Sequence, residues 1–161
     1  MRRGSHTYIL IILGLIISDQ LLKLLILKKF LGPTKLFFIE NKAITLGFMP
    51  TINEGLAFSV DLPQIITIIM VPIIVALLAF WLYQKVKSGS LIYAILLSVI
   101  IGGSLSNWID RVCRGGVVDF IGISILNINF AIFNLADLAI TTGVIIILLV
   151  ETKIIKIHEN I

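Results

Sequence analysis

The fold is decided by the stretch LIYAILLSVIIGGSLSNWIDRVCRGGVVDFIGISI, residues 91–125. Its first part, Leu91 to Ile109, is apolar and long enough to cross the roughly 30 Å hydrocarbon core of a bilayer as a helix. The run ends at Asp110, and Gly115-Gly116 then permits a sharp chain reversal. Val117 to Ile125 is rich in β-branched residues and predicts a strand. The stretch therefore predicts a membrane helix, after which the chain reverses direction and continues as a strand of a small sheet.

Three other apolar stretches are of similar length, at about residues 8–27, 65–83 and 130–150. The composition agrees with a membrane protein, because 58% of the 161 residues are hydrophobic and 14% are charged, whereas soluble domains carry about 25% charged residues. Pro72 lies in the second stretch and predicts a kink. We therefore expect one membrane domain of the all-α class, residues 1–161, with four transmembrane helices and a small β-sheet.

The segment from Gly32 to Leu62 is too long for a simple turn between two spans. It contains two β-prone patches, Leu36 to Ile39 and Ala43 to Phe48, and Pro50 interrupts it. By topology this segment lies on the same membrane face as Val117 to Ile125. We therefore expect these strands to pair.

The charged residues limit the kinds of partner that the chain could bind, but they do not decide its orientation in the membrane. The net charge of +4 indicates attraction to anionic lipid headgroups, and no basic cluster is longer than a pair, which argues against nucleic-acid binding. An even number of spans places both termini on one side, and the positive-inside rule chooses that side. Outside the spans the basic residues divide equally between the two faces, six on each. One face has Arg2, Arg3, Lys85, Lys87, Lys153 and Lys156, and the other has Lys28, Lys29, Lys35, Lys42, Arg111 and Arg114.

Ionisable residues at membrane depth are costly and usually functional. They are Asp19, Lys23, Asp110 and Asp137, and Asp119 follows the third span. All five are expected near the same membrane face. This convergence predicts a polar site at that face.

The residue types limit the chemistry of such a site. Both histidines, His6 and His158, lie near the chain ends on the opposite face, which argues against histidine triads and zinc sites. One remaining chemistry is a carboxylate pair that shares a proton. A second is a Ser-Lys dyad with Lys23 as the base and Ser59 or Ser104 as the nucleophile. A third, non-enzymatic possibility is a carrier or channel with Asp19, Asp110 and Asp137 as a proton relay, although no internal repeat supports it.

The chain resembles lipoprotein signal peptidase (type II signal peptidase) along nearly its whole length. Five motifs in the family's order carry the resemblance: Asp19-Gln20-x-x-Lys23; Asn53-x-Gly55-x-Ala57-Phe58; Gly102-Gly103-x-x-x-Asn107-x-x-Asp110-Arg111; Gly116-Val117-Val118-Asp119-Phe120; and Phe133-Asn134-x-Ala136-Asp137.

The resemblance implies an aspartyl endopeptidase with Asp119 and Asp137 as its catalytic dyad, without metal or cofactor. It implies that Asp19 and Lys23 shape the site. It also implies that five residues line the site and hold the substrate backbone: Asn53, Gly103, Asn107, Arg111 and Asn134. The implied substrate is a prolipoprotein with a diacylglyceryl-modified cysteine, cut just before that cysteine. Membrane lipids and cyclic peptide inhibitors such as globomycin are further implied partners.

The resemblance also implies a location in the bacterial cytoplasmic (inner) membrane. Both termini would lie in the cytoplasm, with the active site near the extracytoplasmic face beside a β cradle. Helical spacing is consistent with the roles above, because Asn134 and Asp137 share one helix face and Asp19 and Lys23 are spaced for an intrahelical ion pair. Ser104 and Ser106 are interpreted as packing residues.

Overall fold

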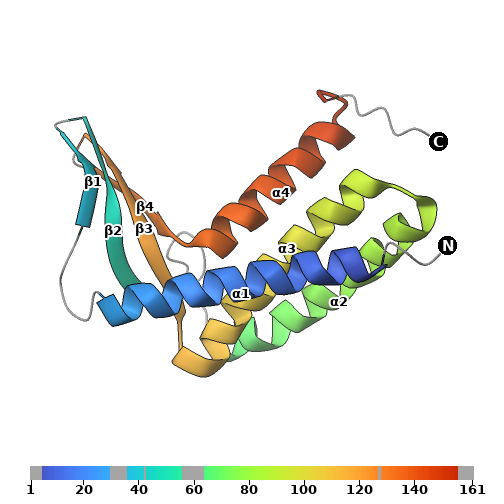
Figure 1. Cartoon of the computed structure of the whole chain (residues 1–161), viewed down its shortest axis with the longest axis horizontal. Coiled ribbons are helices and arrows are strands. Elements are labelled where there is room, and N and C mark those ends of the chain that lie inside the picture. Colours follow the sequence, from blue (N-terminus) through green and yellow to red (C-terminus); the bar gives the residue numbers. More distant parts are fainter. Residues whose placement is uncertain (1–4, 30–35, 42, 56–63, 127, 156–161) are drawn as a thin grey trace.

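The computed structural model describes residues 5–29, 36–41, 43–55, 64–126 and 128–155. Within these residues, four helices and four strands follow one another (Figure 1). Their bounds are α1 Ser5–Lys29, β1 Leu36–Glu40, β2 Ile44–Asn53, α2 Gln64–Ser88, α3 Leu91–Arg114, β3 Val117–Ile125, β4 Ile128–Phe133 and α4 Leu135–Glu151.

Helix α3 is the centre of the bundle, because α1, α2 and α4 each pack against it. Glycines allow two of these approaches. A Cβ at Gly102 would lie 3.1 Å from the carbonyl oxygen of Ile12 in α1, and one at Gly103 would lie 2.8 Å from that of Ala136 in α4. This glycine pair therefore permits the close approach of two neighbouring helices to α3.

Three helices, α1, α2 and α3, are long and apolar enough to cross a membrane. Their outer surfaces agree with this, since in α2 only Thr67 is buried and large side chains such as Leu77 and Phe80 are exposed. A helix that is apolar all round needs lipid as its solvent. The three expected spans at 8–27, 65–83 and 91–109 therefore correspond to α1, α2 and α3.

The fourth expected span begins too early. Residues 130–133 belong to strand β4, and α4 begins only at Leu135. Its 17 residues extend about 25 Å, which is shorter than the hydrocarbon core of a typical bilayer. Within this apolar run, Ala131 to Phe133 pair with β3, where their backbone groups find ladder partners.

The kink expected at Pro72 stays a prediction, and α2 continues as a helix through this residue. A proline cannot donate to the carbonyl four residues earlier, which here belongs to Ile68. That oxygen instead accepts a hydrogen bond from the indole nitrogen of Trp108 in α3, at 2.9 Å. The freed carbonyl of α2 thus becomes a link between α2 and α3.

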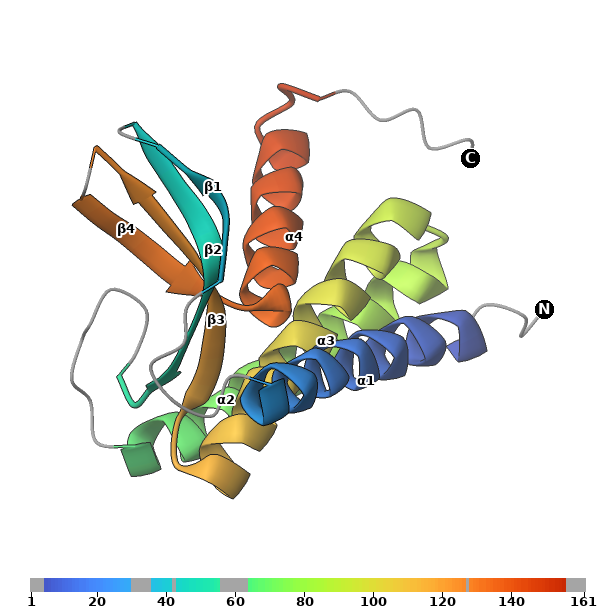
Figure 2. The same ribbon diagram turned by 60° about the vertical axis from the view of Figure 1, so that its left-hand side comes forward.

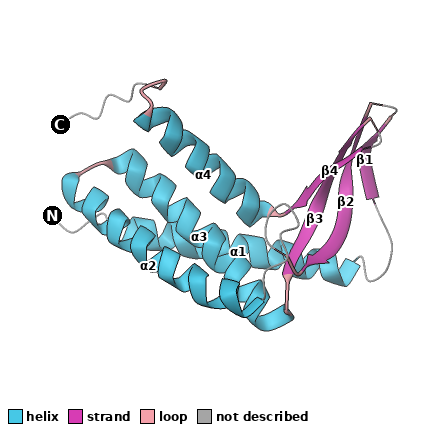
Figure 3. Ribbon diagram, turned by 180° about the vertical axis from the view of Figure 1, so that it is seen from behind, coloured by secondary structure: helices cyan, strands magenta, loops and turns pink. Residues whose placement is uncertain are grey.

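The strands form one antiparallel sheet in the order β1-β2-β3-β4, located at one end of the helices (Figures 1 and 3). The expected pairing of the two loop segments is confirmed, because Thr51 of β2 lies opposite Asp119 of β3. Pro50 was expected to interrupt this segment, but it lies inside β2 rather than at its end. It falls in a register shift between Phe48 and Thr51, where the ladder is interrupted and no donor is needed.

The join between α3 and β3 follows the predicted reversal. Gly115 ends α3 in the left-handed conformation, with φ of 77°. A Cβ on Gly116 would lie 2.7 Å from the side chain of Ile52 in β2, so only glycine lets the strands meet there. The reversal brings β3 back beside the start of α4 (Figure 2). The start of α1 and the end of α4 lie at the other end of the bundle.

Candidate active site

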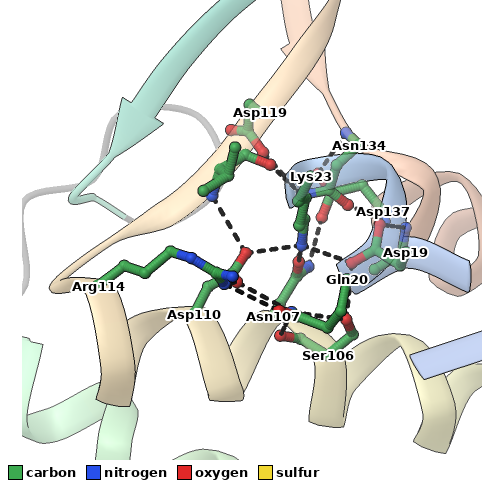
Figure 4. A network of polar contacts seen from close by, with 12 residues as sticks. Asp19, Gln20, Lys23, Ser106, Asn107, Asp110, Arg114, Asp119, Asn134 and Asp137 are labelled. Atoms are coloured by element: carbon green, nitrogen blue, oxygen red, sulfur yellow. Dashed lines mark hydrogen bonds and ion pairs between the residues drawn. The ribbon is translucent and has the colours of Figure 1, made fainter. Parts of the chain in front are cut away.

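Asp119 and Asp137 lie where the sheet meets the helices. Asp119 is on β3 and is almost fully buried, and Asp137 is in the first turn of α4 and is half-buried. One residue contacts both carboxylates. Asn134 donates from its side-chain Nδ2 to Asp119 Oδ1 at 2.8 Å and from its backbone nitrogen to Asp137 Oδ2 at 3.1 Å. The two acidic residues therefore belong to one hydrogen-bonded group (Figure 4).

The start of α4 holds Asp137 in place. Asn134 is the N-cap, and its side-chain oxygen accepts the backbone N–H of Asp137 at 2.8 Å. The Asp137 carboxylate returns the bond to the Asn134 backbone, which completes a capping box. A negative charge in the first turn also interacts favourably with the helix dipole. Local helix capping thus fixes the side chain proposed to carry chemistry.

Two further amides donate to the carboxylates. Asn53 Nδ2 lies 3.0 Å from Asp119 Oδ2, and Asn107 Nδ2 lies 2.7 Å from Asp137 Oδ1. Asn53 comes from β2 and Asn107 from α3, so four elements meet at the site. Among the described residues, each of the four carboxylate oxygens therefore accepts one N–H group.

Burial raises the pKa of Asp119 to about 6. Removal from water disfavours the ionised carboxylate, and the neighbouring Asp137 charge acts in the same direction. The hydrogen bonds from Asn53 and Asn134 and the charge of Lys23 oppose this shift without cancelling it. A carboxyl group that gains its proton near pH 6 is suited to proton transfer at neutral pH.

Lys23 lies at the centre of a buried ion cluster behind the two aspartates. Its Nζ is 2.6 Å from Asp19 Oδ2 and 2.7 Å from Asp110 Oδ2, and all three side chains are fully buried. A third bond of 3.0 Å runs to Asn107 Oδ1. The expected Asp19–Lys23 pair is therefore present, and Asp110 joins it from α3.

The cluster includes three more residues, which the sequence analysis had not assigned to the site: Gln20, Ser106 and Arg114. Arg114 pairs with Asp110 one turn earlier, and Gln20 donates to Asp110 at 2.9 Å. Ser106, expected to be a packing residue, donates to Asp19 at 2.7 Å. The four-residue spacing of Asp110 and Arg114 was a usable signal, whereas nothing local marked Ser106.

Unlike the three asparagines, Arg111 and Gly103 make no described hydrogen bond to Asp119 or Asp137. Arg111 Nη2 donates to the Gly55 carbonyl at 3.0 Å, while Nη1 is buried without a hydrogen-bond partner among the described residues. Gly103 lies at the close contact of α3 with α4, one helical turn before Asn107. Of the second motif, Ala57 and Phe58 lie outside the described residues.

The geometry does not favour Lys23 as a base for a serine. An ammonium group has three N–H bonds, and its three contacts here are all with oxygen acceptors. Ser106, the serine bound into the cluster, donates to Asp19 and accepts from Gln20. Ser59 lies outside the described residues.

Comparisons with known proteins agree on one group. The family model described as "Signal peptidase (SPase) II" matches residues 11–153. A lipoprotein signal peptidase of Streptococcus pneumoniae (strain ATCC BAA-255 / R6) is 38% identical over 144 residues, which are 89% of this chain and 90% of that protein. A lipoprotein signal peptidase of Anaplasma phagocytophilum (strain HZ) is 37% identical over 113 residues, which are 70% of this chain and 65%, just under two thirds, of that protein.

Solved structures show the same fold. One described as a bacterial membrane enzyme, determined by the in meso method at 2.3 Å resolution, has a TM-score of 0.79 and 31% sequence identity. It covers 93% of this chain, which in turn covers 90% of it. A second, at 1.9 Å resolution, has a TM-score of 0.77 and 31% identity, over 93% of this chain and 95% of that one.

Proposed function

This chain belongs to the signal peptidase II family, and we propose that it cleaves diacylglyceryl-modified prolipoproteins with Asp119 and Asp137 as an aspartyl dyad. Family membership supports a membrane peptidase that removes signal peptides from prolipoproteins. The observation that carries the dyad is the shared partner Asn134, which bonds to both carboxylates at the start of α4. The cut is proposed just before the lipid-modified cysteine.

The chemistry requires one ionised and one protonated carboxyl group. The ionised group takes a proton from a water molecule, whose oxygen then forms a bond to the scissile carbonyl carbon. The protonated group donates to the carbonyl oxygen, so that a tetrahedral intermediate forms without a free oxyanion. The carbon–nitrogen bond then breaks: the proton taken from water passes to the leaving amine, and a hydroxyl group of the intermediate returns its proton to the dyad as the new carbonyl forms.

The amides are proposed to hold the carboxylates during this cycle. Asn53, Asn107 and Asn134 donate to them directly, so their first task is to fix the dyad. Substrate backbone would be bound mainly by Arg111, whose buried Nη1 has no partner among the described residues and whose charge lies close enough to act on both aspartates. A donor in this position would bind a peptide carbonyl beside the scissile bond.

Orientation in the membrane is part of the proposal. The sheet, which carries Asp119, and the first turn of α4, which carries Asp137, lie at one end of the helices, and the start of α1 and the end of α4 lie at the other (Figure 1). With both termini in the cytoplasm, the site would lie near the extracytoplasmic face of the bacterial inner membrane. Globomycin and related cyclic peptides would compete with substrate there. A fourth membrane crossing by α4, which is shorter than the other helices, is also proposed.

The test is cleavage of a diacylglyceryl-modified precursor and of its unmodified twin by purified protein. We expect Asp119→Asn and Asp137→Asn each to lower the rate by more than about 100-fold, because each removes one of the two groups that transfer protons. Glu54→Gln is the matched control, since Glu54 is an exposed acid beside Asn53. Full activity in either aspartate variant would exclude the dyad, and equal cleavage of both precursors would exclude the proposed substrate class.

A further inference from the structure

We propose that Lys23 is a positioning residue, which holds the side-chain amide of Asn107 with its NH₂ end towards Asp137. The inference rests on the proposed dyad. Lys23 is fully buried, and none of its hydrogen bonds and ion pairs described above reaches Asp119 or Asp137 directly. The juxtaposition is a chain of contacts from Lys23 to Asn107 to Asp137 (Figure 4).

The direction of the Asn107 amide follows from the chemistry of its neighbours. The two ends of an amide are similar in size, so shape alone does not choose between them. One end lies 3.0 Å from Lys23 Nζ, and an ammonium group can only donate. That end must therefore be the oxygen. The NH₂ end then faces Asp137 Oδ1 at 2.7 Å, where a carboxylate can accept it.

Asn134 is fixed in the same way but by a different donor. Its side-chain oxygen accepts the backbone N–H of Asp137, which can only donate, so its NH₂ group is directed to Asp119. The same NH₂ group lies 3.1 Å from Asn107 Oδ1 and supports the Asn107 orientation. That support is neutral and shared with Asp119. The charged bond from Lys23 is stronger, since charge-assisted bonds are roughly twice as strong as neutral ones.

The ion cluster fixes Lys23 as well as neutralising it. Burying an ion pair is often not stabilising, because the loss of hydration offsets the attraction. Here Asp19 and Asp110 hold Nζ from two helices, α1 and α3. Asp19 also accepts the backbone N–H of Ala136 at 3.1 Å, one residue before Asp137. The cluster therefore acts on Asp137 through both the Asn107 amide and the start of α4.

The test separates the ammonium group from the charge balance of the cluster. Lys23→Met combined with Asp110→Asn removes one positive and one negative charge, and Asp110→Asn alone is the matched control with the ammonium retained. Cleavage of the lipidated precursor in detergent would be measured at temperatures where circular dichroism shows each variant folded. We expect the double variant to lose about 10- to 100-fold in kcat relative to the control, with KM within about twofold, because a misplaced reacting group lowers kcat.

A pH profile gives a readout that a purely structural role would not move. The charged groups acting on Asp119 are Lys23 from α1, Arg111 from α3 and Asp137 from α4. Loss of the Lys23 charge removes one influence that lowers the pKa of Asp119. The limb of the profile that reports Asp119 should therefore move to higher pH in the double variant. Equal kcat and equal profiles in the double variant and its control would overturn the inference.

A second variant covers the case in which the double variant does not fold. Asn107→Asp keeps an oxygen for Lys23, but it has no N–H group for Asp137 and places a second carboxylate beside it. We expect it to remain folded and to lose at least as much kcat as the double variant. Wild-type kcat in Asn107→Asp would overturn the inference. Asp119→Asn is measured alongside: cleavage by that variant would refute the dyad itself, whereas its inactivity with an unaffected Lys23 series would refute only the positioning role.

Discussion

Asp119→Asn should change how the stability of the folded protein depends on pH. Burial raises the pKa of Asp119 from 3.8 to about 6, a shift of about 2 units that corresponds to about 3 kcal/mol. Only 2% of the residue is exposed, so solvent screening does not reduce this figure much. Asparagine has nearly the same shape and does not ionise in this range.

The sign follows from proton binding. The folded protein holds the Asp119 proton more tightly than the unfolded chain, so this carboxyl favours folding most below pH 3.8. The contribution is lost as the pH rises from about 4 through about 6. Relative to wild type, Asp119→Asn should therefore gain about 3 kcal/mol of unfolding free energy between pH 3 and pH 8.

Thermal unfolding in detergent across this pH range measures the effect. About 1 kcal/mol moves the Tm of a soluble domain of this size by roughly 2–4 °C, so the difference in Tm between variant and wild type should change by roughly 6–12 °C in favour of the variant. Glu54→Gln is the control, because water screens an exposed carboxylate. Parallel Tm curves for wild type and Asp119→Asn would refute the argument that Asp119 is desolvated in the folded protein.

Three other predictions concern neighbouring features. Asn53→Ala removes a hydrogen bond that lowers the pKa of Asp119, so the Asp119 limb of the kcat/KM profile should move to higher pH; an unmoved limb would contradict this. Trp108→Phe leaves the Ile68 carbonyl without its donor, and a loss of about 1–3 kcal/mol should appear in thermal unfolding in detergent. Cys113, the single cysteine, is exposed near the sheet end of α3, so a membrane-impermeant thiol reagent should label it from outside intact spheroplasts. Labelling that requires permeabilisation would reverse the proposed orientation.

Much of the fold could be predicted because it depends on local patterns. Apolar runs of about 20 residues predicted α1, α2 and α3, and Gly115-Gly116 predicted the reversal into β3. The start of α4 was placed too early, since the run from Phe130 onwards is apolar in both its strand and its helix. Hydropathy does not distinguish an apolar strand from an apolar helix, and ladder partners on β3 decide between them.

The site divides in the same way. The sequence by itself predicted two close pairs from helical spacing: Asn134 with Asp137, and Asp19 with Lys23 as an ion pair one turn apart. The structure corrected the form of the first pair, because Asn134 is the N-cap of α4 and makes a capping box with Asp137 rather than sharing a helix face with it.

Only the tertiary structure decided which of these groups meet. Ser106 binds Asp19 across 87 positions of the chain, and the backbone N–H of Ala136 reaches the same carboxylate across 117. The side-chain oxygen of Asn107 accepts a hydrogen bond from Lys23, and its NH₂ group donates one to Asp137. Such contacts depend on how α1, α3 and α4 pack, and a buried donor must find an acceptor among whatever side chains that packing brings close.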